Sequence, residues 1–271
     1  MISSRKQATN VYLGMGILII GIIAYVAVAS QQEKPNPETN CYKHISGKIA
    51  ILIDKTDIIP PQTQTEIAAR ALAAINEHSK MGDLISVYEI TQDSLTALKP
   101  AFQICRPKSG SESNELTENS KKIDKDFKEK FEKPLIDILS ANTGQAQNSP
   151  IAEAIMDINL STAMRDAKYG RIILFSDLMQ HSSNVSTYGC NNPDSAINLF
   201  KASRQGSSQR PTFNNTIVEL HIIPRPKMTE QEVQCRDKFW LWFLGDMRGQ
   251  DYGVQRLDLP GSYGAVIPTK N

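Results

Sequence analysis

The sequence lacks an excess of charge of either sign. It carries 30 Lys and Arg against 29 Asp and Glu, which gives a formal net charge of +1. A protein that binds nucleic acid by neutralising phosphates needs a strong local excess of Lys and Arg. The composition therefore excludes a nucleic-acid partner of that kind.

Cysteine, glycine and proline are also scarce. Four Cys, 15 Gly and 14 Pro among 271 residues exclude a disulfide-dense miniprotein and a collagen-like chain. The sequence contains no Walker loop, no Ser/His/Asp triad pattern and no CxxC pair, and its four His have no ligand-like spacing. What remains is an ordinary globular chain, long enough to bury one sizeable core.

Acidic residues are missing from the first 30 positions, which contain only two bases, Arg5 and Lys6. Residues 11–30 carry no charge. At ~1.5 Å rise per residue, a helix of that length spans the ~30 Å hydrocarbon core of a bilayer. We therefore predict a cytoplasmic tip at residues 1–10 and a transmembrane helix at residues 11–30.

A removed signal peptide is the alternative, because Ala27-Val28-Ala29 resembles a cleavage site. In both cases Arg5 and Lys6 keep the tip in the cytoplasm. The rest of the chain should then face the periplasm, or another extracytoplasmic side, of a cell (inner) membrane that it crosses once. Residues 31–40 are polar and interrupted by Pro, so we expect a linker that holds the domain at residues 41–271 off the membrane.

Short apolar, β-branched runs alternate with segments of helical spacing in the rest of the chain. Such alternation predicts one three-layer, Rossmann-like α/β domain with a mostly parallel central sheet. The third strand follows the second within a hairpin-sized gap, so we expect it to be the one antiparallel edge strand. The predicted strands are 47–54, 83–90, 100–105, 170–177 and 216–224, and the predicted helices are 67–79, 123–138, 149–160, 194–204 and 229–247.

Three sequence patterns mark predicted helix starts. Thr63-x-x-Glu66 and Thr229-x-x-Glu232 are capping boxes, and Ser149 is a predicted N-cap with Pro150 in the first helical position. Residues 106–120 are loop by composition. The aromatic cluster at residues 239–244 is expected to pack in the core, with a partner surface as the alternative.

Two predicted strands end in an aspartate, Asp54 and Asp177. Ligands of open α/β sheets bind in the crevice at the carboxyl ends of the strands. Thr56 lies two residues after Asp54, and Ser149 begins a helix that can bring its hydroxyl to the same edge. Two carboxylates and two hydroxyls suit a hard cation, so we predict a Mg²⁺ site. The alternative is that the aspartates only bond loop amides.

These residues resemble the metal-ion-dependent adhesion site of von Willebrand factor A (vWA) domains. Asp54-Lys55-Thr56 resembles the start of the family's DxSxS element, Ser149-Pro150-Ile151-x-x-Ala154 its T-P-L-x-x-A element, and Phe175-Ser176-Asp177 its hhhSDG strand end. The resemblance extends over residues 47 to about 246. It implies a module without catalysis of its own that binds a protein partner, whose acidic side chain completes the metal site.

The sequence departs from the family pattern at three positions. Ile58 takes the place of the second Ser of DxSxS, Ser149 that of Thr, and Leu178 that of Gly. The loss of a hydroxyl at Ile58 removes one metal ligand, so the site is expected to be degenerate.

Two other functions stay open at this stage. Asp54-Lys55-Thr56 also resembles the DKTG element of phosphohydrolases with haloacid-dehalogenase topology, in which the aspartate is the nucleophile. Asp57 stands where that family has Gly and adds negative charge where phosphate must approach. The other alternative is a purely structural subunit of a membrane complex.

The four cysteines have no zinc-type spacing and predict two disulfides in an oxidising compartment, with four buried thiols as the alternative. In the expected strand order, the end of the antiparallel third strand lies at the same edge of the sheet as Cys41. The predicted pairs are therefore Cys41 with Cys105 and Cys190 with Cys235.

Overall fold

The structure of the protein is a computed structural model. It describes residues 33–260 apart from 96, 97, 142, 143, 207, 226, 250 and 251, and also residues 15, 17–21 and 23. Most of the predicted transmembrane segment, residues 11–30, lies outside the described residues, as does the predicted tip at 1–10. Among the residues that are described, no helix combines the length and the apolar character that a membrane crossing requires.

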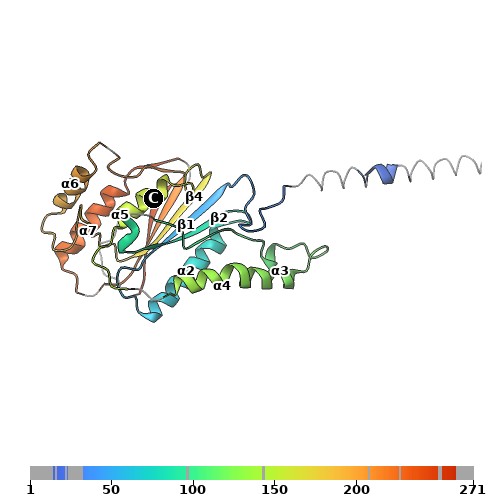
Figure 1. Ribbon diagram of the computed structural model, residues 1–271, viewed down its shortest axis with the longest axis horizontal. Coiled ribbons are helices and arrows are strands. Elements are labelled where there is room, and N and C mark those ends of the chain that lie inside the picture. Colours follow the sequence, from blue (N-terminus) through green and yellow to red (C-terminus); the bar gives the residue numbers. More distant parts are fainter. Residues whose placement is uncertain are drawn as a thin grey trace, which may run out of the picture.

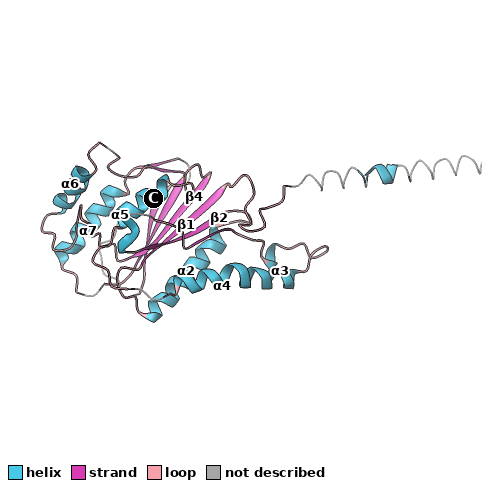
Figure 2. Cartoon of the chain, viewed as in Figure 1, coloured by secondary structure: helices cyan, strands magenta, loops and turns pink. Residues whose placement is uncertain are grey.

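A six-stranded sheet forms the centre of the domain (Figure 1, Figure 2). Its order is β3-β2-β1-β4-β6-β8, and every neighbouring pair is parallel except β2 with β3. The predicted α/β class, with a mostly parallel sheet and one antiparallel edge strand, is confirmed. The strands are β1 (Gly47–Asp54), β2 (Leu84–Ile90), β3 (Phe102–Cys105), β4 (Tyr169–Ser176), β6 (Thr216–Ile222) and β8 (Gly253–Asp258).

Helices cover both faces of the sheet (Figure 1). Along β1, Ile49, Ile51 and Ile53 pack with one set of helices, whereas Ala50 and Leu52 pack with the other. Successive side chains of a strand point to opposite faces, so the continuous apolar run of β1 is what a strand buried on both sides requires. One face is covered by α2 (Pro61–His78), α3 (Ser120–Phe127), a π turn (Lys128–Glu132) and α4 (Lys133–Leu139), and the other by α5 (Ile151–Leu160), α6 (Pro193–Ser203) and α7 (Glu230–Phe243).

Two of the three predicted helix starts are wrong. Helix α2 begins at Pro61, so Thr63 lies inside the helix; the fixed φ of proline suits the first helical position. Helix α5 begins at Ile151, with Pro150 as its N-cap. Ser149 instead forms a backbone bridge with His181. The third start is confirmed, because the Thr229 and Glu232 side chains form the predicted capping box of α7.

Sequence reasoning missed the polar strands. Strand β8 pairs with β6 at the sheet edge, and β5 (Phe213–Asn214) pairs with β7 (Met247–Arg248) in a separate two-stranded sheet. Most residues of β8 are exposed or half-buried, so the strand lacks the apolar run that marks the central strands. The predicted loop at 106–120 contains one 3₁₀ turn, Gly110–Glu112.

Three of the four aromatic residues of α7 belong to the core. Phe239, Trp240 and Phe243 are fully buried. Phe239 and Phe243 pack against Phe200 of α6, and Trp240 packs against both of them. Such large side chains contribute much of the apolar area that a core buries. The expectation of core packing is therefore confirmed for these three residues, and they offer no surface to a partner.

The segment before β1 folds onto the domain. Cys105 donates its backbone N–H to the Thr39 carbonyl at 2.8 Å, and the Asn40 side chain donates to the Cys105 carbonyl at 3.1 Å. Ser46 accepts backbone bonds from Lys168 and Tyr169, at the start of β4. Thr39 and Asn40, expected to belong to the linker, are thus bonded at the end of the sheet where β1 begins, whereas Glu33, Asn36 and Glu38 bond to residues 36–43 of the same segment.

Both predicted disulfides are present. Cys41 pairs with Cys105 at the end of β3, and Cys190 pairs with Cys235 in α7. The described cysteines include no free thiol. The first bond fastens the segment before β1 to an edge strand, and the second fastens the loop after β4 to a helix.

Replacing Cys41 and Cys105 together by Ala should lower the free energy of unfolding by about 2–4 kcal/mol, because the bridge restricts the unfolded chain. It should also expose residues 33–46 to proteolysis, since only hydrogen bonds would then hold them. Chemical denaturation and limited proteolysis with mass mapping measure the two effects. The double Cys190→Ala, Cys235→Ala variant is the control, and equal cleavage of residues 33–46 in both variants would contradict the prediction.

Candidate functional site

The parallel pairing of β1 and β4 brings two strand ends together. Asp54 is the last residue of β1 and Ser176 the last of β4, and the register pairs Ile53 with Phe175 just before them. Asp177 follows directly. The chain therefore places both aspartates at the carboxyl edge of the sheet, where the sequence analysis expected them.

The Asp54 carboxylate is buried and accepts four hydrogen bonds. Its Oδ1 accepts from the backbone N–H of Thr56 at 3.1 Å and from the Thr56 hydroxyl at 2.6 Å. Its Oδ2 accepts from the Ser149 hydroxyl at 3.1 Å and from the Ser176 hydroxyl at 2.8 Å. Three hydroxyls from three separate segments thus converge on one carboxylate. Ser176, which was not among the predicted site residues, is one of the three.

Burial shifts the ionisation of both aspartates. Loss of water, followed by the negative charge of Asp177, raises the pKa of Asp54 to about 6, although bonds from Thr56 and Ser176 act in the opposite direction. Burial likewise raises the pKa of Asp177 above its ordinary value. Two like charges in one poorly solvated place oppose each other's ionisation, so this edge of the sheet favours a cation.

Arg225 supplies positive charge at this edge. Its Nη1 donates to Oδ2 of Asp177 at 2.5 Å and to Oδ2 of Asp57 at 2.5 Å. Burial acts to lower the pKa of the guanidinium, but Asp177 and Asp57 raise it above its usual value, so the group stays charged. Arg225 follows the end of β6, and no motif in the sequence marks it. Its position after a parallel strand was the only available signal.

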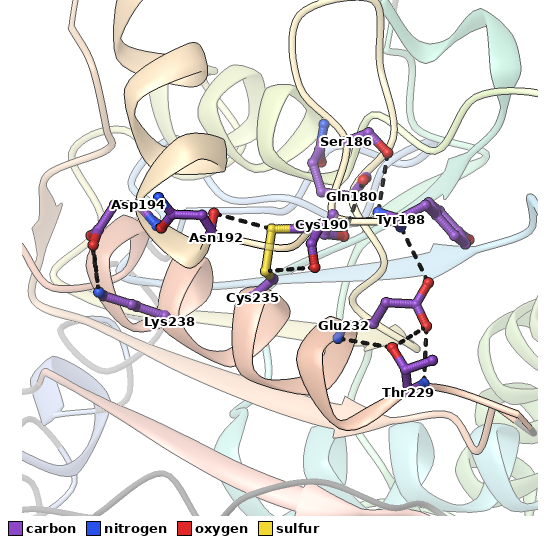
Figure 3. Close-up of a disulfide and its surroundings, with 12 residues drawn as sticks. Gln180, Ser186, Tyr188, Cys190, Asn192, Asp194, Thr229, Glu232, Cys235 and Lys238 are labelled. Carbon is purple, nitrogen blue, oxygen red and sulfur yellow. Dashed lines mark hydrogen bonds and ion pairs between the residues drawn. A yellow bond between two sulfur atoms is a disulfide. The ribbon is translucent and has the colours of Figure 1, made fainter.

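The loop after β4 holds Arg225 from the side. The guanidinium carbon lies 4.9 Å from the centre of the Tyr188 ring, a cation–π distance. Figure 3 shows how this loop is fixed to α7: the Cys190–Cys235 disulfide joins them, and the Gly189 N–H donates to Glu232 at 3.2 Å. The disulfide therefore helps to set the place of the Tyr188 ring.

Leu178 stands where the vWA pattern has Gly, and it adopts a left-handed backbone with φ of 62°. That conformation costs a side-chain-bearing residue about 1–3 kcal/mol. The Leu178 N–H donates to the Ser176 hydroxyl at 2.9 Å, and the Trp240 indole N–H donates to the Leu178 carbonyl at 2.7 Å. These two bonds hold the turn that carries Asp177 despite the missing glycine.

Two hollows open beside the strand ends. One, of about 270 Å³, is lined by Asp54, Asp177 and Ile58 among others. The other, of about 310 Å³, is lined by Thr56, Ser149 and Tyr188 among others. Asp57 and Arg225 line both. Their ion pair therefore lies between the two openings, over the group of polar side chains.

The predicted Mg²⁺ ligands are Asp54, Thr56, Ser149 and Asp177, and the structure brings all four to one edge. Their oxygens are of the kind that a hard cation takes, so the donor set fits Mg²⁺ in chemistry. Ile58 is exposed and offers no oxygen. Within the described part of the chain, no three or more His, Cys, Asp or Glu are grouped to hold a metal. The role of the four residues as ligands stays a prediction.

The raised pKa of Asp54 predicts a pH dependence in EDTA. Between about pH 4 and pH 6 the folded state binds more protons than the unfolded chain, so this carboxyl lowers the free energy of unfolding as pH rises through that window. Asp54→Asn removes the effect. Between about pH 4 and pH 7, the free energy of unfolding of the variant should rise by about 2 kcal/mol relative to that of wild type.

Chemical denaturation at a series of pH values measures that difference. Asp166→Asn, at an exposed ion pair with Arg165, is the matched control. Its difference from wild type in the free energy of unfolding should not change with pH in this window. Parallel stability curves for wild type and Asp54→Asn would contradict a raised pKa.

No family model and no curated protein matches the chain. Among solved structures, it is similar to proximal thread matrix protein 1 from the mussel byssus, described with a zinc-occupied MIDAS motif, at 14% identity and a TM-score of 0.31. The match covers 81% of this chain and 45% of the other. The chain thus spans less than half of that protein's length.

Proposed function

We propose that the chain is a membrane-anchored, extracytoplasmic vWA-like module that binds a protein partner at the carboxyl edge of its sheet. The observation that carries this proposal is the convergence of the Thr56, Ser149 and Ser176 hydroxyls on buried Asp54, with Asp177 beside it. The sequence resembles the vWA metal-site elements at three places, which begin at Asp54, Ser149 and Phe175. The strand order and the strand-end position of those elements agree with that resemblance.

The attachment of the N-terminal segment supports an orientation for the module. Thr39, Asn40 and Ser46 are bonded at the end of the sheet where β1 begins, opposite the edge that carries Asp54. If residues 11–30 are the anchor, residues 31–38 separate it from the first of these bonds, a reach of at most about 30 Å. The crevice would then lie at the end of the domain that faces away from the membrane and toward partners.

Mg²⁺ is part of the proposal as the cofactor of the crevice. Asp54, Thr56, Ser149 and Asp177 would hold it, and the ion would offer positive charge to an acidic side chain of the partner. Asp177 would have to exchange its Arg225 pair for the ion. Asp54 would likewise have to release the Thr56 and Ser149 hydroxyls, whose oxygens would turn to the ion. The missing hydroxyl at Ile58 should make the affinity modest.

Catalysis is not part of the proposal. In a phosphohydrolase with Asp54 as nucleophile, one of its oxygens must be free to attack phosphorus. Here each oxygen accepts two hydrogen bonds. The neighbouring cation, Lys55, donates its Nζ to Oε1 of Glu89 at 2.6 Å and to the Ile138 carbonyl at 2.9 Å. Turnover of a generic phosphoester that disappears in Asp54→Asn would favour the enzyme instead.

Millimolar Mg²⁺ or Mn²⁺ should raise the melting temperature of the full chain in detergent. An ion at ten times its Kd stabilises the folded state by about 1.4 kcal/mol. Asp54→Ala and Asp177→Ala should fold and lose the response, whereas Asp166→Ala keeps it. If neither ion changes the wild-type melting temperature, the metal part of the proposal fails.

The anchor has a separate test. In a bacterium with two membranes, the protein should stay in the membrane fraction after an alkaline wash, and protease added to spheroplasts should degrade the domain. A removed signal peptide would instead release a soluble periplasmic form with a mass lacking about 30 residues. Protection from protease in spheroplasts would overturn the extracytoplasmic assignment.

A further inference from the structure

Arg225 makes two ion pairs of unequal strength. Asp177 has a side chain that is 9% exposed, whereas the side chain of Asp57 is 53% exposed. A buried, charge-assisted bond is strong, and a solvent-exposed ion pair contributes little. Asp177 therefore fixes the guanidinium in place, while Asp57 is a partner that another anion can replace.

The guanidinium also keeps unused donors. Both ion pairs involve Nη1, and within the described residues Nε and Nη2 of Arg225 form no hydrogen bond. An arginine carries five N–H donors in a planar fork that matches the two oxygens of a carboxylate. Arg225 lines both hollows beside the strand ends, so an incoming group can approach it from either one.

The side chain is held in a fixed place before any partner arrives. The Tyr188 ring packs against the guanidinium, and the disulfide of Cys190 fixes the loop that carries the ring. A preorganised cation loses little conformational freedom when it binds, which favours affinity. An ordinary surface arginine has neither the buried carboxylate behind it nor the ring beside it.

We propose that Arg225 is a carboxylate-binding residue, and that an acidic side chain of the partner replaces Asp57 on its guanidinium. The inference rests on the proposed function, because it concerns the same crevice and the same partner. It differs in the cation: Arg225 belongs to the chain, so recognition through it needs no divalent ion. Asp57 acts in this arrangement as an internal competitor for the partner's carboxylate.

The test is binding of a fluorescently labelled oligoglutamate peptide to the full chain in detergent, followed by anisotropy in EDTA. An oligoglutamine peptide of the same length is the ligand control. Wild type should bind oligoglutamate, and Arg225→Gln should weaken binding about tenfold or more. Arg225→Lys, which keeps the charge without the fork, should fall between them. Arg165→Gln makes the same charge change at an exposed ion pair with Asp166 and should bind as wild type does.

Asp57→Asn should change oligoglutamate binding in the opposite direction. Tighter binding in this variant cannot be explained by misfolding. Arg225→Gln leaves buried Asp177 without its cation and can lower stability, whereas Asp57 is exposed and its replacement should leave the fold intact. Removal of the competitor should strengthen oligoglutamate binding about threefold, within the range of an exposed ion pair. The melting temperature of each variant is measured alongside.

Each outcome separates the two proposals. Binding in EDTA that falls in Arg225→Gln and rises in Asp57→Asn supports Arg225 as the receptor. Binding that requires Mg²⁺ and is unchanged in Arg225→Gln overturns this inference and leaves the proposed function standing. Wild type that binds oligoglutamate no better than oligoglutamine, with or without Mg²⁺, overturns carboxylate recognition, while the cation-induced stabilisation still tests the proposed metal site.

Discussion

The carboxyl edge of the sheet is organised around one buried carboxylate. A carboxylate removed from water costs several kcal/mol unless hydrogen bonds or charge replace the solvent. The chain offsets part of that cost for Asp54 with four donors that come from three places in the sequence. The turn after Asp54, the segment before α5 and the end of β4 must therefore meet at one point, and this requirement fixes their arrangement.

The same constraint explains the charge balance of the crevice. Asp54 and Asp177 are both buried, which raises the pKa of each, and the negative charge of Asp177 raises the pKa of Asp54 further. Arg225, in the segment after β6, forms ion pairs with both Asp177 and Asp57. One guanidinium faces three carboxylates, so the crevice keeps an unbalanced negative charge whenever all three are ionised. A cation would balance that charge directly. A partner's carboxylate on Arg225 leaves the charge at the guanidinium unchanged when it takes the place of Asp57, because Asp57 is exposed and can turn to solvent.

The sequence revealed the strands that are buried on both faces, because their apolar runs are unbroken and two of them end in an aspartate. It revealed the pairs of cysteines, because the strand order places them at opposite ends of the sheet. Polar β8 was missed since an edge strand needs no apolar run. Ser149 lies at the expected edge, but its predicted N-cap role is wrong, because its hydroxyl donates to Asp54. Its predicted role as a metal ligand stays a prediction.

Arg225 escaped detection for a different reason. Its partners Asp57 and Asp177 lie 168 and 48 residues away in the chain, so no local pattern could join them. Only the sheet order brings the end of β6 beside the end of β4. The arginine also depends on Tyr188, whose loop is fastened by the disulfide of Cys190. Reduction of this disulfide would release the loop from α7 and with it one of the contacts that hold Arg225 in place.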